Sequence, residues 1–168
     1  MEFVKRLEPR FYNQATGDMI QDQYEEIFEV VYITNGAVGV GYRLFNEIFY
    51  GMRIVMSKDK KIISPINDYS CLTNKCSEFL YKPIDYVEAL AMRKENFNIT
   101  MQDPFAKKMK PEIARNYKYT IQEPLHEHRD EMASKFENRI DYVDISAYGI
   151  GKVKVEQPGE TPDTNEAQ

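Results

Sequence analysis

The Asn35-Gly36 dipeptide constrains the fold more than any other feature of this sequence. Val30–Ile33 precedes it and Ala37–Tyr42 follows it, and both runs have the composition of β-strands. An Asn-Gly pair between two such runs is typical of a two-residue hairpin, because both central positions of a type I′ turn require positive φ. We therefore predict that Ile33 and Val38 lie on paired strands.

The first half of the chain consists of short β-rich runs separated by Gly, Asn and Pro. This pattern, over Leu7–Pro83, favours an all-β sandwich or roll over alternating βαβ units. Ile48–Met56 is predicted to form a further strand with a bulge at Gly51. Lys58–Lys60 is predicted to form the exposed turn after that strand.

The order and spacing of these features resemble a known family. Five segments resemble the N-terminal part of a cyclic-nucleotide-binding domain in their order and spacing. They are Thr16–Ile20, the acidic stretch Asp22–Glu26, Val30–Ile33, Asn35-Gly36 and Ala37–Tyr42. The family's phosphate cassette, F-G-E-(I/L)-x-L-(L/I)-x-x-x-x-R-(T/A)-A in one-letter form, can be laid on Ile66–Phe79 without a gap. The resemblance implies an α+β fold: a β-roll (double-stranded β-helix or jelly roll) with flanking α-helices.

The cassette keeps apolar positions but not the family's binding residues. Asn67 replaces the glycine that lets the backbone approach the phosphate, and Asp68 replaces the glutamate that holds the ribose hydroxyl. Ser77 replaces the arginine, Glu78 stands where a threonine or alanine belongs, and Tyr69 lies beside Asp68. A cyclic phosphate needs a cationic fork and amide donors, because a buried anion without partners is costly. The resemblance thus implies a degenerate pocket that binds neither cyclic AMP nor cyclic GMP and holds a carboxylate instead.

Two alternatives stay open at this segment. Asp68 retains the acceptor chemistry for a ribose hydroxyl, but it also fits a loop carboxylate that caps local amides. Lys75 or Lys82 lies near enough in sequence to supply a displaced positive charge. A lysine is a point charge rather than a fork, so affinity and selectivity would both fall.

The resemblance also organises the second half of the chain. Phe79–Tyr81 and Tyr86–Met92 complete the roll in the family's register, although the second run would pass for a helix on propensity alone. Phe97 is expected to dock the following helix back on the sheet. Three helices are predicted, two of them with a proline in the first turn: Lys94–Met101, Pro111–Ile121 and Pro124–Phe136.

Three regions follow from this reading: a cyclic-nucleotide-binding-like domain over 1–121, a helix-and-strand extension over 122–148 and a disordered acidic tail over 149–168. Ile140–Tyr148 alternates weakly in the manner of a strand. In one potassium-channel branch of the family, a strand after the last helix fills the pocket. If this stretch does the same, Tyr142 and Val143 occupy the pocket; the alternative is an edge or partner-binding strand.

Composition argues against several functions. The net charge is −5 and the only basic run is Lys58–Lys61, so the electrostatic footprint of a nucleic-acid-binding protein is missing. The apolar runs are strand-sized, far below the roughly 20 residues of a membrane span. The first residues lack the apolar core of a secretory signal, which favours a cytosolic environment.

Candidate catalytic and metal-binding residues are few. Ser70 and Cys71 have neither a Gly-x-Ser-x-Gly turn nor a nearby base. Cys71 and Cys76 lack the second pair of a zinc site, so we expect reduced thiols, one of them packed. His126 and His128, two positions apart on a predicted helix, point to different faces and are expected to be solvated. We predict no catalytic residue and no metal.

The sequence therefore predicts a non-enzymatic regulatory domain. It most resembles the degenerate C-terminal cyclic-nucleotide-binding homology domains of voltage-gated potassium channels. This implies a cytosolic gating domain, with the rest of the channel and the neighbouring subunits of a tetramer as partners. The alternative is a soluble cyclic-nucleotide-binding regulatory or scaffold module, which would need an arginine at Ser77.

Overall fold

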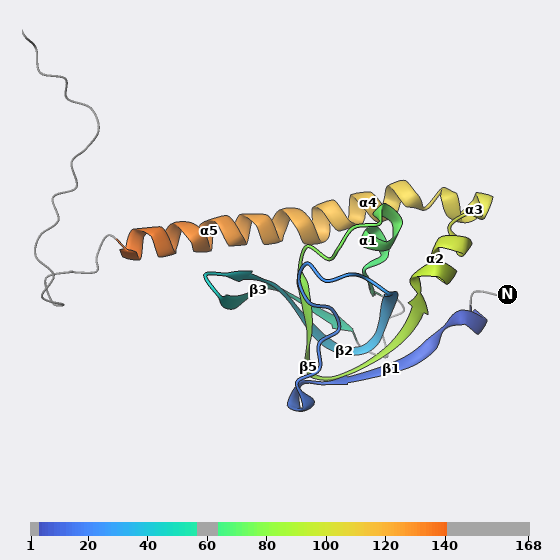
Figure 1. Ribbon diagram of the computed structural model, residues 1–168, viewed down its shortest axis with the longest axis horizontal. Helices are drawn as coiled ribbons and strands as arrows, with labels where there is room; N and C mark the ends of the chain where they lie inside the picture. Colours follow the sequence, from blue (N-terminus) through green and yellow to red (C-terminus); the bar gives the residue numbers. More distant parts are fainter. Residues whose placement is uncertain (1–3, 57–63, 141–168) are drawn as a thin grey trace, which may run out of the picture. The chain divides into compact units, whose positions relative to one another are not determined.

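The structure is a computed structural model that describes residues 4–56 and 64–140 (Figure 1). The chain divides into two units, Met1–Ala133 and Ser134–Gln168, and the fold and sites discussed below lie in the first. Three predicted features fall outside the described residues: the turn at Lys58–Lys60, the strand containing Tyr142 and Val143, and the tail over 149–168.

One antiparallel sheet of five strands forms the roll, and its order is β1-β5-β2-β3, with β4 paired to β2 off this path. The strands are β1 (Glu8–Asn13), β2 (Glu29–Leu44), β3 (Glu47–Met56), β4 (Ser64–Ile66) and β5 (Leu80–Arg93). Two short 3-10 turns, η1 (Val4–Arg6) and η2 (Gln14–Thr16), flank β1. An antiparallel sheet with flanking helices confirms the predicted fold class.

The predicted hairpin at Asn35-Gly36 is wrong, because β2 continues through these two residues without a turn. On one side of β2, Val31–Ile33 pairs with β4 and Gly36–Leu44 pairs with β3, while β5 pairs along its other side. The register shifts on both sides of Asn35, so the dipeptide forms a bulge that bends the strand. Gly36 has a φ of 104°, and a Cβ there would lie 2.4 Å from the carbonyl oxygen of Tyr86.

The hairpin between β2 and β3 turns instead at Phe45 and Asn46. Both have positive φ, 51° and 65°, and Leu44 pairs with Glu47, as expected of a two-residue turn. The bulge predicted at Gly51 is confirmed, because Val40 pairs with Met52 whereas Gly41 pairs with Tyr50. Sequence reasoning missed the turn because a bulky aromatic residue rarely adopts positive φ.

The run Tyr86–Met92 is a strand rather than a helix, and it lies with Leu80 and Tyr81 in the single long strand β5, which begins one residue after Phe79. Asp85, with a φ of 64°, lies in β5 opposite the bulge of β2. Between the pairs Asn35–Glu88 and Ala37–Ile84, β5 has three residues where β2 has one. Both central strands therefore bend at the same level, which curves the sheet into a roll.

The helices after β5 come in the predicted order, with two differences, and one helix that was not predicted, α1, lies between β4 and β5. The described helices are α1 (Asp68–Thr73), α2 (Lys94–Thr100), α3 (Pro104–Lys107), α4 (Lys110–Tyr117), the π-helical turn η3 (Lys118–Gln122) and α5 (Glu123–Ile140). Sequence reasoning missed α3, although Asp103 caps it by accepting from the backbone amides of Phe105 and Ala106. None of the helices within 4–56 and 64–140 is long and apolar enough to cross a membrane.

The two helices predicted at Pro111–Ile121 and Pro124–Phe136 merge into one continuous helical run. Pro124 has no N–H to donate to an earlier carbonyl, and it is the second residue of α5, two residues after the end of η3 at Gln122. There the amide of Glu123 donates to the carbonyl of Lys118, five residues back. A π-type turn next to the proline thus keeps the helix running where the sequence suggested a break.

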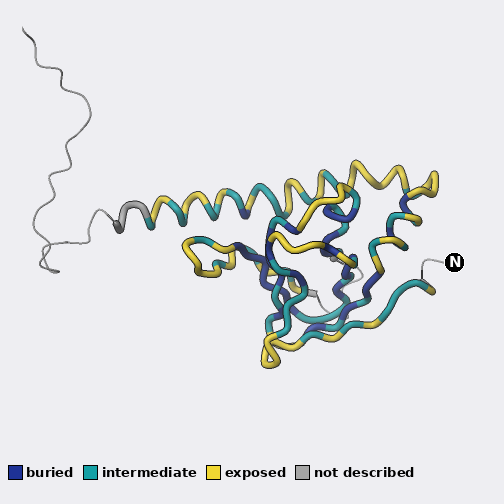
Figure 2. Tube along the Cα trace, viewed as in Figure 1, coloured by how far each residue is buried: buried dark blue, intermediate teal, exposed yellow. Residues whose placement is uncertain are grey.

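The buried residues gather along the strands of the roll, with a second group under the first helices (Figure 2). The inner cluster consists of buried residues from β2, β4 and β5, together with Phe79 just before β5 and Leu125 from α5. The second cluster lies between β2, β5, α1 and α2, and contains Cys71 and Phe97. Phe97 is only 1% exposed, which confirms it as the anchor of its helix, and Cys71 is the packed thiol.

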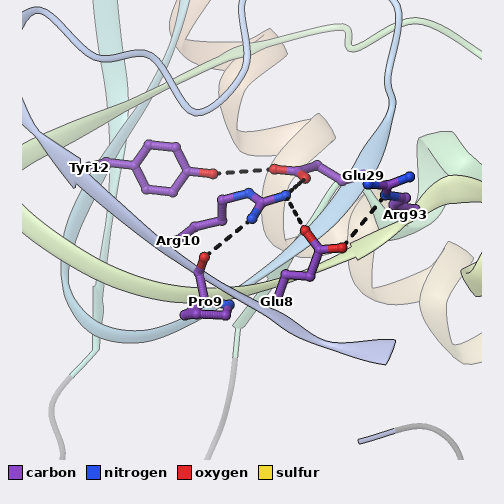
Figure 3. Close-up of polar contacts among 6 residues, drawn as sticks. All are labelled: Glu8, Pro9, Arg10, Tyr12, Glu29 and Arg93. Atoms are coloured by element: carbon purple, nitrogen blue, oxygen red, sulfur yellow. Dashed lines mark hydrogen bonds and ion pairs between the residues drawn. The ribbon is translucent and has the colours of Figure 1, made fainter. Parts of the chain in front are cut away.

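A polar network ties the edge strand to the centre of the sheet (Figure 3). Arg10 on β1 contacts Glu8 and reaches Glu29 on β2, both at 3.0 Å. Tyr12 donates to the same Glu29, and burial together with that carboxylate raises the pKa of Tyr12 to about 12. These partly buried contacts span β5 and hold β1 in register.

Candidate functional site

The segment placed on the family's phosphate cassette forms a strand end, a sharp turn and a short helix. Asn67, in the place of the family's glycine, has a φ of 71°, which asparagine tolerates better than most residues. Its side-chain amide donates to Oε1 of Gln21 at 3.0 Å, and both residues are buried. Asn67 thus adopts a backbone conformation that glycine adopts readily, and its side chain is bonded to Gln21.

Asp68 is the first residue of α1 and is half-buried. Its Oδ1 accepts from the backbone amide of Tyr69 at 2.7 Å, the bond expected of a carboxylate that caps local amides. Burial raises the pKa of Asp68 to about 6. The ring of Tyr69 stacks on Tyr117 of α4, with centroids 4.4 Å apart and planes 11° apart.

Ser77, which takes the place of the family's arginine, is committed to the backbone. It is 2% exposed, and its hydroxyl donates to the carbonyl of Phe79 at 2.6 Å. Its own carbonyl accepts from the amide of Tyr24. A hydroxyl with this partner offers no positive charge to a ligand.

Glu78 is the centre of the site, because three side chains from the C-terminal helices converge on its carboxylate. The Tyr117 hydroxyl and the Gln122 amide reach Oε2 at 3.2 Å and 2.9 Å. Nε2 of His126 lies against Oε1. These donors come from α4, η3 and α5 in turn. We call the group of Glu78, Tyr117, Gln122 and His126 the carboxylate clasp.

The clasp lies beside an apolar seam on the same helical run. Tyr117, Ile121 and Leu125, spaced four residues apart, pack on the inner core of the roll, and Leu125 is fully buried. A Cβ at Gly51 would lie 2.8 Å from Leu125, so the bulge glycine permits this close approach. Burying a leucine side chain contributes roughly 1.5–3 kcal/mol, which makes the seam the larger part of the docking energy.

The prediction that the two histidines are solvated is wrong. His126 contacts Glu78, and Nδ1 of His128 lies 2.7 Å from the hydroxyl of Tyr42. Leu125 is buried against the roll, and His126 and His128 lie on either side of it on the helix surface. Both rings therefore contact the roll. The sequence did contain a signal for these contacts. A stripe at helical spacing, formed by Tyr117, Ile121, Leu125 and His128, was overlooked.

Burial and neighbouring carboxylates shift the ionisation of the surrounding tyrosines. Burial raises the pKa of Tyr117 well above its usual range, with further contributions from Tyr81 and Glu78. Burial also raises the pKa of Tyr81, near Asp68 and Glu78. These phenols are therefore neutral donors at physiological pH, as the clasp requires.

The cassette gains no positive charge from the lysines considered as substitutes. Lys75 is exposed in the turn after α1, and Lys82 is half-buried on β5. Within residues 4–56 and 64–140, no Lys or Arg forms an ion pair with Asp68 or Glu78. The same residues contain no group of three metal-ligating side chains.

No protein-family model matches the sequence, and no curated protein sequence matches it significantly. Solved structures do match. CBD2 of a protein kinase A regulatory subunit bound to Sp-2Cl-cAMPS aligns with a TM-score of 0.56 and 14% identity, over 75% of this chain and 74% of that chain. The regulatory subunit of a cAMP-independent protein kinase A from Trypanosoma brucei aligns with a TM-score of 0.55 and 15% identity, over 77% and 40%.

A channel fragment also matches: the C-linker and cyclic-nucleotide-binding homology domain of zELK channels, crystallized in the presence of cAMP. It aligns with a TM-score of 0.50 and 12% identity, over 66% of this chain and 52% of that chain. The match thus spans about half of the channel fragment and less of the Trypanosoma subunit. The chain has the fold of cyclic-nucleotide-binding domains, which confirms the resemblance at the level of fold.

Proposed function

We propose that this chain is a non-enzymatic regulatory domain whose C-terminal helix is held against the cassette without a nucleotide. The observation that supports this is the carboxylate clasp: Glu78 accepts from three side chains of the helices that follow the roll. In the family's cassette, this position adjoins the arginine that binds the cyclic phosphate. Here an anion of the protein itself stands next to that place.

Electrostatics makes cyclic-nucleotide binding unfavourable under this proposal. Asn67 and Ser77 are engaged with Gln21 and Phe79, so neither is available to a phosphate. The negative charge of Glu78 would repel one. At an effective dielectric constant of 20, two like charges about 4 Å apart repel by roughly 4 kcal/mol before screening, which is nearly a thousandfold in affinity.

The finer proposal is the cytosolic C-terminal gating domain of a voltage-gated cation channel, acting on the rest of the channel and on neighbouring subunits of a tetramer. The degenerate cassette and the similarity to the zELK fragment support it. The alternative is a soluble regulatory or scaffold module, supported by the similarity to kinase regulatory subunits. Sequencing the full transcript discriminates the two, because only the channel requires membrane-spanning segments in the same reading frame.

Calorimetric titration with cyclic AMP and cyclic GMP tests the proposed function. We expect no saturable heat below about 100 μM of either nucleotide, because the cassette offers no cation and its anion is already in place. Lys75→Gln serves as a matched control, since Lys75 is exposed outside the clasp. Saturable binding that Lys75→Gln abolishes would mean that a displaced cation restores the pocket, and the proposal would fail.

A further inference from the structure

A cavity of about 350 Å³ lies on the other side of the cassette helix from the clasp. Its walls come from β2, β4, α1, α2, α3 and α4. Its lining consists mostly of apolar side chains, among them Phe97, Met101, Ala106, Met109 and Ile113. None of the four clasp residues contributes to it. Its volume falls within the range of small-molecule sites, which are mainly apolar with a few polar groups.

The polar side chains that line this cavity include two carboxylates. Asp68 and Glu112 line it, with Thr100 and Asn116, and none of its lining residues within 4–56 and 64–140 is a lysine or arginine. Glu112 is paired with Arg115 at 2.6 Å, and the Thr100 hydroxyl donates to the carbonyl of Asn96. Glu112 and Thr100 therefore have partners within the protein.

Asp68 differs from the other polar groups on this wall. Its carboxylate accepts from the backbone amide of Tyr69 and is also stabilised by its own backbone amide, and no cation within the described ranges forms an ion pair with it. Burial raises its pKa to about 6, so near pH 7.5 it is mostly ionised and its charge is not offset. A buried carboxylate without a counter-ion favours a cationic partner from solution.

The apolar wall suits the rest of such a ligand. Phe97 is almost fully buried at the back of the cavity, and Met109 at its edge is half exposed. Methionine side chains are flexible and polarizable, so Met101 and Met109 adapt to ligands of different shape. The lining therefore combines one unpaired negative charge with an adaptable apolar surface.

We propose that this cavity binds a small amine with an apolar body, whose ammonium group pairs with Asp68 and whose body lies between Phe97, Met101 and Ile113. The site is independent of the proposed function, because it does not use the clasp. Its ligand touches both α1 and α4, the two helices that are also joined by the Tyr69–Tyr117 stack. Binding therefore stabilises the folded arrangement of these helices and raises the melting temperature.

The test uses the full chain and two probes that differ in charge alone, 4-phenylbutylamine and 4-phenylbutan-1-ol. Calorimetry at pH 7.5 is expected to show saturable binding of the amine at least about tenfold tighter than that of the alcohol, the advantage of one ion pair (about 1.4 kcal/mol). Asp68→Asn is expected to remove this difference. Glu47→Gln, which neutralises an exposed acid on the roll, is the matched control and is expected to leave it unchanged.

A second variant separates loss of the site from loss of the fold. Met109→Trp places a larger side chain at the half-exposed edge of the cavity and is expected to weaken both probes with no change in the melting temperature of the free protein. The proposal is overturned if amine and alcohol bind equally, if neither binds the folded chain, or if Glu47→Gln weakens the amine as much as Asp68→Asn does. An amine that binds Met109→Trp as tightly as the wild type also overturns it, because the ligand then lies elsewhere.

Discussion

Two carboxylates of the cassette segment, Glu78 and Asp68, lie ten residues apart and have opposite surroundings. Glu78 accepts from three side chains of the C-terminal helices, which leaves little of its hydrogen-bonding capacity unused. Asp68 accepts only from backbone amides, lies beside a mostly apolar cavity and has no cationic partner among the described residues. The difference is that side chains of the C-terminal helices already use Glu78, whereas no described side chain pairs with the charge of Asp68, which is why the two proposals use different carboxylates of one segment.

The largest expected effect comes from Leu125, which anchors α5, the helix that carries the clasp donor His126. Leu125→Ala should destabilise the protein by about 2–5 kcal/mol, because a fully buried leucine leaves a cavity when it is truncated. Urea unfolding measures this loss. Amide exchange should speed up around Glu78. It should stay slow around Asp68, because the cavity beside Asp68 is lined by residues of α2, α3 and α4.

Phe105→Ala is the control for this prediction, because Phe105 is 78% exposed on α3 and its truncation should change stability by less than about 0.5 kcal/mol. Equal effects of Leu125→Ala and Phe105→Ala would show that the helix does not depend on the roll. The contrast between the two carboxylates would then lose its structural basis.

The sequence predicts a residue's place in this fold well when its neighbours in the chain determine it, and poorly when partners far away in the chain do. The bulge at Gly51 was predicted correctly from its neighbours, because it is a glycine inside a strand-like run, and Phe97 was predicted correctly from the family resemblance. Asn35-Gly36 was misread because pairing with β5, some fifty residues later, overrides its local turn preference. His126 was misread for the same reason, since its partner Glu78 lies 48 residues away.

The charge of Asp68 should appear in the pH dependence of stability. Its pKa is raised from 3.8 to about 6 in the folded protein, so between pH 4 and 6 the folded state keeps a proton that the unfolded state releases. This contribution to stability is therefore present at low pH and is lost as pH rises through the folded pKa, by up to about 3 kcal/mol. The Asn side chain of Asp68→Asn does not titrate.

Urea unfolding of the wild type and of Asp68→Asn at pH 4 and pH 7 isolates this contribution, because all other groups titrate in both proteins. The variant should gain stability relative to the wild type on going from pH 4 to pH 7. A difference between the two proteins that is the same at both pH values would mean that Asp68 is well solvated or paired, and its contrast with Glu78 would disappear.

The smallest expected effect concerns Glu78 itself. It tests the comparison of the two carboxylates by removing the one that has hydrogen-bond donors around it. Glu78→Ala removes the acceptor of Tyr117, Gln122 and His126 and should cost about 1–3 kcal/mol in urea unfolding at pH 7, because partly buried donors lose their partner. Glu78→Gln keeps one acceptor oxygen and should cost less. The opposite sign is expected for Asp68→Asn at this pH, since neutralising an unpaired buried carboxylate relieves a cost. If both substitutions change stability in the same direction and by the same amount, the two carboxylates share one environment, and the clasp does not hold the helix.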